Sequence, residues 1–118
     1  QRSTQIYAPL YFSTYNSEAK SFLRSIQYNY QLVSNLSGYM GSFDLTNLFK
    51  KLKLDILFLY SSDDQIILSE HIQQKSDLLL QSNLYPRKLD KVGHFSFVDD
   101  LKLVKNEIEC FLLNKSSK

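Results

Sequence analysis

A short, nearly continuous apolar run over residues 55–60 (DILFLY) constrains the fold more than any other feature of the chain. Its length and its lack of alternation are typical of a strand buried on both faces in a parallel sheet. The run ends at the polar residues 61–64 (SSDD), where we expect the strand to stop. A buried parallel strand needs a crossover to its neighbour, so the next residues should form a helix.

The segment after this turn has the pattern of a helix followed by a second strand. Ser69 and Glu70 predict the N-cap and first turn of a helix that ends near Asn83. The alternation over residues 85–92 then predicts a strand, and Pro86 near its start favours a place close to the edge of the sheet.

The carboxy-terminal segment has the clearest amphipathic pattern in the chain. Asp99 or Asp100 is expected to cap this last helix, and residues 115–118 should form a frayed polar tail. The apolar face of the helix consists of Leu101, Val104, Ile108, Phe111 and Leu112. The order of elements from residue 55 is therefore strand, helix, strand, helix, which predicts an α/β fold.

Residues 1 to about 50 are rich in Tyr, Ser and Asn and have a weaker periodicity. Ser17 is the expected cap of a helix that reaches Val33, and the turn-forming residues 35–42 (NLSGYMGS) should end it. The apolar face of that helix would consist of Phe22, Leu23, Ile26, Tyr30 and Val33.

Composition excludes several classes of function. A chain of 118 residues is long enough for one compact domain and too short for two. Its 14 basic and 12 acidic residues give a net charge of +2, too even a balance to imply nucleic acid or an anionic membrane surface as a partner. No stretch approaches the roughly 20 apolar residues of a transmembrane segment. The single cysteine, Cys110, excludes an internal disulfide framework and a cysteine-rich zinc site. The spacing of His71 and His94 matches no metal motif.

Asp64 and His94 are the candidate site residues. Each follows one of the two expected strands, and 30 residues separate them, the size of one βαβ unit. The carboxyl ends of neighbouring parallel strands meet at one edge of the sheet, where open α/β folds place their sites. A carboxylate and an imidazole in this arrangement can hydrogen-bond, which holds the imidazole in one tautomer and stabilises its protonated form.

A simpler interpretation exists for each of these residues. Asp63 and Asp64 would both be turn residues, since Asp is common where a strand ends, and His94 would be a structural histidine. The pairing of Asp64 with a Gly-His step after a strand favours the functional interpretation, with Asp63 as the turn residue.

These segments resemble a known family. Residues 54–64 (LDILFLYSSDD) look like the late strand and acid loop of α/β-hydrolases, and residues 93–97 (GHFSF) look like their histidine loop. The acid lipase branch, which comprises gastric and lysosomal lipases and steryl ester hydrolases, is the closer resemblance. Residues 105–108 (KNEI) stand where that branch has a last helix reading "Tyr-Asn-Glu-Ile", and 31–33 (QLV) with 43–44 (FD) are similar to the end of its cap.

The resemblance implies a serine ester hydrolase in which Asp64 is the acid and His94 the base of a Ser-Asp-His triad. Residues 1–48 would be the end of a helical cap subdomain, and 49–118 the carboxy-terminal β-α-β-α part of the hydrolase core. It further implies a lipid ester substrate, no cofactor or metal, and a secreted or lysosomal protein.

The nucleophile elbow Gly-x-Ser-x-Gly of these enzymes does not occur in the sequence. Since the serine precedes the acid and the histidine in such chains, we expect it upstream of Gln1, in the same protein or a companion chain. The start at Gln1, without Met or a signal peptide, is consistent with a processed product, a fragment or one part of a larger chain.

Three departures from the family pattern support a second hypothesis. Ser61-Ser62 replaces glycines, Gln65 replaces an aromatic residue, and Ser96 replaces an acid. The alternative is a catalytically inactive hydrolase-like domain used for binding or assembly. An intact upstream Gly-x-Ser-x-Gly would favour the enzyme, and a replaced serine would favour the inactive domain.

Overall fold

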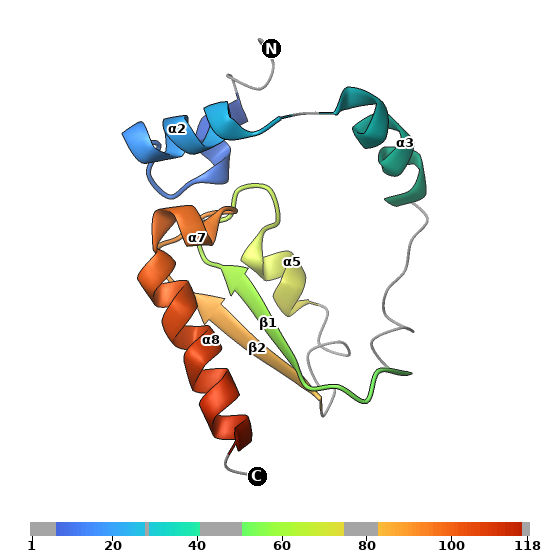
Figure 1. Cartoon of the computed structure of the whole chain (residues 1–118), viewed down its shortest axis with the longest axis vertical. Coiled ribbons are helices and arrows are strands. Elements are labelled where there is room, and N and C mark those ends of the chain that lie inside the picture. Colours follow the sequence, from blue (N-terminus) through green and yellow to red (C-terminus); the bar gives the residue numbers. More distant parts are fainter. Residues whose placement is uncertain (1–6, 28, 41–50, 75–82, 117–118) are drawn as a thin grey trace.

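The computed structural model describes residues 7–27, 29–40, 51–74 and 83–116. It is a mixed α/β structure in which two parallel strands form one sheet (Figure 1). The elements, in chain order, are the 3-10 helix η1 (Ala8–Tyr11), α2 (Ser17–Ser25), α3 (Tyr30–Met40), β1 (Ile56–Ser61), α5 (Ser69–Gln73), β2 (Leu84–Leu89), α7 (Ser96–Asp99) and α8 (Leu101–Ser116).

The sheet confirms the expected order of a strand, a helix and a parallel strand. β1 and β2 lie side by side, with Ile56 opposite Leu84 and Ser61 opposite Leu89. Pro86, which has no amide hydrogen to donate, lies in β2 opposite Phe58. The expectation that the first strand is buried on both faces is wrong for the described residues, because Ile56 to Tyr60 are only half-buried. A strand with one neighbour leaves part of its faces and one edge uncovered.

The expected single helix from Ser17 to Val33 is divided into α2 and α3. Asn16, not Ser17, caps α2, since its side-chain oxygen accepts the amide of Ala19 at 2.9 Å. The backbone is extended at Ile26, and Asn29 then caps α3 by accepting the amide of Leu32 at 3.0 Å. Two asparagine caps thus start two helices where apolar spacing alone predicted one.

The expected turn at residues 35–42 is also wrong over its described part, since α3 continues through Gly38 to Met40. Glycine costs a helix about 1 kcal/mol relative to alanine, which weakens a helix without ending it. Residues 41 and 42 lie outside the described part.

The helix expected from Ser69 to Asn83 is described only as the short α5. Ser69 is its first residue, and Leu68 holds the N-cap position without a side-chain hydrogen bond. Residues 75–82 lie outside the described part.

The last helix is confirmed, with two corrections at its ends. Asp100 caps α8, because its carboxylate accepts the amide of Leu103 at 2.9 Å. Asp99 ends the short preceding helix α7 and bonds elsewhere, so it is not the cap. The helix includes Lys115 and Ser116, which we expected in a frayed tail.

At the carboxyl end of the sheet, α2 packs on α7 (Figure 1). Aromatic rings connect the two sides: Phe22 lies 5.1 Å from Phe95 and 5.6 Å from Phe97, and Phe12 lies 5.5 Å from Phe95, measured between ring centroids. Such edge-on and tilted pairs each contribute about 0.5–1.5 kcal/mol beyond the burial of their surface. The buried apolar residues of the described part are Ala8, Phe12, Ala19, Leu84, Leu89 and Val92.

The division into residues 1–48 and 49–118 stays a prediction, because residues 41–50 around the boundary lie outside the described part. None of the helices that the structure describes has the length and apolar character of a membrane-spanning segment.

Candidate active site

Asp64 lies in the loop after β1, three residues beyond the end of the strand. Its Oδ1 accepts two backbone hydrogen bonds, from the amides of Ile66 and Ile67, both at 2.8 Å. The side chain is only 10% exposed. Burying a carboxylate is costly unless hydrogen bonds replace its water, and the two amides do so here. They also fix the direction of the second oxygen, Oδ2.

His94 lies five residues beyond the end of β2, so it does not directly follow the strand as we expected. A turn intervenes, in which Lys91 has a φ of 61°, a left-handed conformation that is uncommon for a residue with a side chain. The Ser62 hydroxyl accepts the Lys91 amide at 2.8 Å, and the Asp63 amide donates to the Val92 carbonyl at 3.1 Å. These bonds join the two loops after the strands.

The structure brings Asp64 and His94 together, with Nδ1 of the imidazole 3.0 Å from Oδ2 of the carboxylate. A carboxylate only accepts hydrogen bonds, so the proton of this bond belongs to Nδ1. In the neutral imidazole the lone pair is then on Nε2. Within the described residues Asp64 is the one hydrogen-bond partner of His94, whose side chain is 28% exposed. The pair can therefore take up a proton at Nε2 while the carboxylate stabilises the charge that forms.

Aromatic residues enclose the imidazole. The Tyr11 ring lies edge-on to it, with centroids 5.6 Å apart, and the Phe95 ring lies 5.2 Å away. Gly93 is needed at this place, because a Cβ there would lie only 2.7 Å from the backbone carbon of Phe12. Only a glycine allows the amino-terminal segment to approach so closely.

The other candidates do not join this pair. The Asp63 carboxylate is exposed and accepts the Ser62 hydroxyl at 2.6 Å. His71 lies on α5 and is exposed, and Cys110 is an exposed free thiol on α8. Over the described ranges, no three His, Cys, Asp or Glu side chains gather as a metal site would require.

Sequence reasoning missed the part that residues 11–13 and Asp99 have at this site. The Tyr11 carbonyl accepts the Phe95 amide at 3.1 Å, and the Asp99 carboxylate accepts the amides of Ser13 and Gly93. One signal in the sequence could have indicated this role. A helix N-cap needs only one acid, and two, Asp99 and Asp100, precede α8, so one of them was available for another contact.

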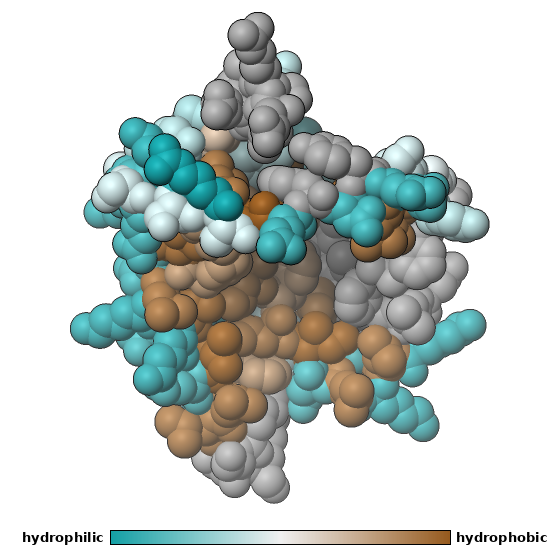
Figure 2. All heavy atoms as spheres, turned by 45° about the horizontal axis from the view of Figure 1, so that its top comes forward, coloured by the Kyte–Doolittle hydropathy of each residue, from teal (hydrophilic) through white to brown (hydrophobic). Residues whose placement is uncertain are grey.

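Exposed apolar residues follow both members of the pair in the sequence. Ile66, Ile67 and Leu68 follow Asp64 directly and are 42%, 50% and 38% exposed. Phe97, three residues after His94, is also exposed. Figure 2 shows hydrophobic surface over the middle and lower part of the face that it draws, below a hydrophilic upper margin. Apolar surface of this kind is typical of a place where an apolar ligand or another protein surface binds.

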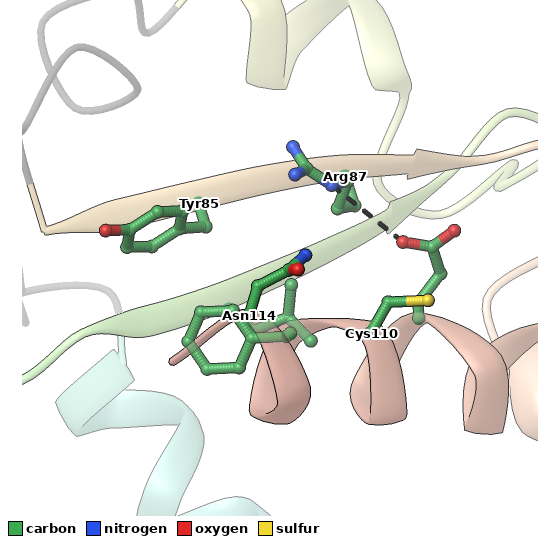
Figure 3. Close-up of a pocket in the computed structure, with 7 residues that line it drawn as sticks. Tyr85, Arg87, Cys110 and Asn114 are labelled. Atoms are coloured by element: carbon green, nitrogen blue, oxygen red, sulfur yellow. Dashed lines mark ion pairs between the residues drawn. The ribbon is translucent and has the colours of Figure 1, made fainter. Parts of the chain in front are cut away.

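A pocket of about 110 Å³ lies away from this pair, between the sheet and α8 (Figure 3). Tyr85 and Arg87 extend into it from β2, and Cys110 and Asn114 from α8. Arg87 lies 3.9 Å from Glu107, an exposed ion pair of the kind that contributes little to stability. Neither Asp64 nor His94 lines this pocket.

Compared with family models, curated proteins and solved structures, the chain matches none.

Proposed function

We propose that this chain supplies the acid and the histidine of a serine carboxylester hydrolase with a lipase-like α/β-hydrolase fold. Asp64 would orient His94, and the nucleophilic serine would come from residues upstream, in the same protein or in a companion chain. The observation that carries the proposal is the 3.0 Å contact between His94 Nδ1 and an Asp64 carboxylate that two backbone amides already hold in place.

The pair has the requirements of a catalytic base. Nε2 of His94 takes the proton of the serine hydroxyl while the serine oxygen bonds to the ester carbonyl carbon. His94 returns that proton to the leaving alkoxide as the carbon–oxygen bond breaks. It then takes a proton from a water molecule as the water oxygen bonds to the acyl carbon. It returns that proton to the serine oxygen as the acyl–serine bond breaks, which releases the acid and regenerates the serine. Throughout, the Asp64 carboxylate stabilises the imidazolium.

The apolar side chains beside the pair support a lipid ester as the substrate. Ile66 and Ile67 are anchored through their amides to Asp64, yet half of each side chain remains exposed. An acyl chain or another apolar group bound there would lie beside the histidine, and the burial of that group would contribute about 25 cal/mol per Å².

The test uses the complete protein, including the segment that carries the serine. We expect it to hydrolyse a chromogenic short-chain ester and to be labelled covalently by a serine-reactive fluorophosphonate. His94→Ala should abolish both, because the serine is then without its base. His71→Ala is the matched control, since this histidine is exposed on α5 and should be dispensable.

Failure of the complete protein in both assays would contradict the proposal. The alternative, an inactive hydrolase-like domain used for binding or assembly, would then apply. The substitutions at Ser61-Ser62, Gln65 and Ser96 are the observations that favour that alternative.

A further inference from the structure

Asp99, the last residue of α7, accepts hydrogen bonds from two backbone amides outside that helix. A single oxygen of its carboxylate, Oδ2, accepts the Gly93 amide at 2.7 Å and the Ser13 amide at 2.9 Å. Ser13 and Asp99 are 86 residues apart in the sequence. The carboxylate therefore joins the amino-terminal segment to the loop that carries His94.

This contact is distinct from helix capping. Asp100 already caps α8 through the Leu103 amide, and the Asp99 carboxylate bonds to neither α7 nor α8. Gly93 is buried, so its amide would lose a hydrogen bond that water could not readily replace if the carboxylate were removed. A hydrogen bond to a carboxylate is about twice as strong as one between neutral groups.

The backbone is held on both sides of His94. The Gly93 amide is bound to Asp99, and the Phe95 amide donates to the Tyr11 carbonyl at 3.1 Å. Tyr11 in turn lies edge-on to the imidazole. These bonds hold the backbone of His94 in the place from which its side chain reaches Asp64.

We propose that Asp99 is a positioning residue for His94. By binding the amides of Gly93 and Ser13, it holds the histidine loop against the amino-terminal segment and keeps Nδ1 within hydrogen-bonding distance of Asp64. This proposal rests on the proposed function for its catalytic meaning, although the positioning itself can be measured without any substrate.

The test follows the ring of His94 by NMR in the full 118-residue chain labelled with ¹⁵N-histidine, in which His71 is the one other histidine. In the unchanged chain we expect a protonated Nδ1 and an unprotonated Nε2. Asp99→Ala should convert His94 to a mixture of tautomers like that of a solvent-exposed histidine. Asp99→Asn should largely restore the single tautomer, because the amide oxygen still accepts hydrogen bonds.

Asp100→Ala is the matched control, because it removes a cap from α8 and should leave the His94 ring signals unchanged. If Asp99→Ala unfolds the chain, the proposal is tested instead by amide hydrogen exchange in Asp99→Asn. The loss of the charge should speed exchange of the Gly93 amide by about five- to tenfold and leave that of Leu103 unchanged. The proposal is overturned if Asp99→Ala keeps the single tautomer, if Asp100→Ala changes it equally, or if the Gly93 amide exchanges no faster in Asp99→Asn.

Hydrolysis by the complete protein separates this proposal from the proposed function. Asp99→Ala should lower kcat at least tenfold with little change in KM, because the substrate still binds while the base is misplaced. An unchanged kcat in an active enzyme overturns the role of Asp99 and leaves the function standing. An inactive protein overturns the proposed function and leaves the tautomer measurement as the test of positioning.

Discussion

The carboxyl end of the sheet and helix α3 differ in how far their side chains are buried. At the carboxyl end of the sheet, Phe12, Leu89 and Val92 are at most 4% exposed, and hydrogen bonds between distant segments hold the loops around Asp64 and His94. In α3, every side chain described between residues 31 and 39 is exposed, and Figure 1 shows this helix to one side of the sheet. Among the residues that the structure describes, fixed geometry is therefore concentrated where the candidate chemistry lies.

The largest expected effect is a loss of activity on substitution at the carboxyl end of the sheet. In the complete protein, Asp64→Asn should lower ester hydrolysis by about 10⁴-fold with little change in the fold. The asparagine can still accept the amides of Ile66 and Ile67, but its amide group would face His94 Nδ1 and favour the wrong tautomer. Asp63→Asn is the control, because that carboxylate is exposed and bonded to Ser62. Equal losses of kcat/KM from the two substitutions would contradict the assignment of roles.

Two leucines test the difference in packing. Leu89→Ala should lower the free energy of unfolding by about 2–5 kcal/mol, because the side chain is 1% exposed and its removal leaves a cavity. Leu32→Ala in α3 should change it by less than about 0.5 kcal/mol, since that side chain is 54% exposed. Urea denaturation of the chain measures both. A large cost at Leu32 would show that α3 belongs to the cooperative core.

Two glycines test the same difference in packing, because one lies against another segment and the other faces open space. Gly93→Ala should cost about 1–3 kcal/mol, because the new Cβ would meet the backbone of Phe12 and Ser13 at 2.7–2.8 Å. Gly38→Ala should be neutral or stabilise α3 by up to about 1 kcal/mol, since a Cβ there meets nothing within 4 Å and alanine favours the helix. Thermal unfolding of the two variants distinguishes these outcomes, and the same sign for both would break the comparison.

The smallest effects are expected from the two asparagine caps. Asn16→Ala should lower global stability by about 1 kcal/mol, because α2 packs on α7 and takes part in the common core. Asn29→Ala should instead speed amide exchange within α3 and leave the global transition in place. Hydrogen exchange resolved by residue would show whether each loss stays within its own helix.

Local pattern was sufficient for the two strands of the sheet. The apolar run at 55–60 and the alternation after Asn83 predicted β1 and β2 to within about one to three residues, because a strand of this kind is specified by its own sequence. Helix boundaries were less accurate. Apolar spacing cannot show that Asn16 and Asn29 start separate helices, since a cap depends on the backbone conformation at that residue.

The sequence by itself determined that Asp64 and His94 lie at the same end of a parallel sheet, because two polar loops that follow neighbouring parallel strands share one edge. Only the tertiary structure decided which atoms meet. The Ser62 hydroxyl joins the two loops, and two amides direct the Asp64 carboxylate toward Nδ1 of His94. Asp99 was expected to cap a helix, yet it binds Ser13, 86 residues away. Such a contact depends on the packing of the amino-terminal aromatic residues against the histidine loop, which no local pattern encodes.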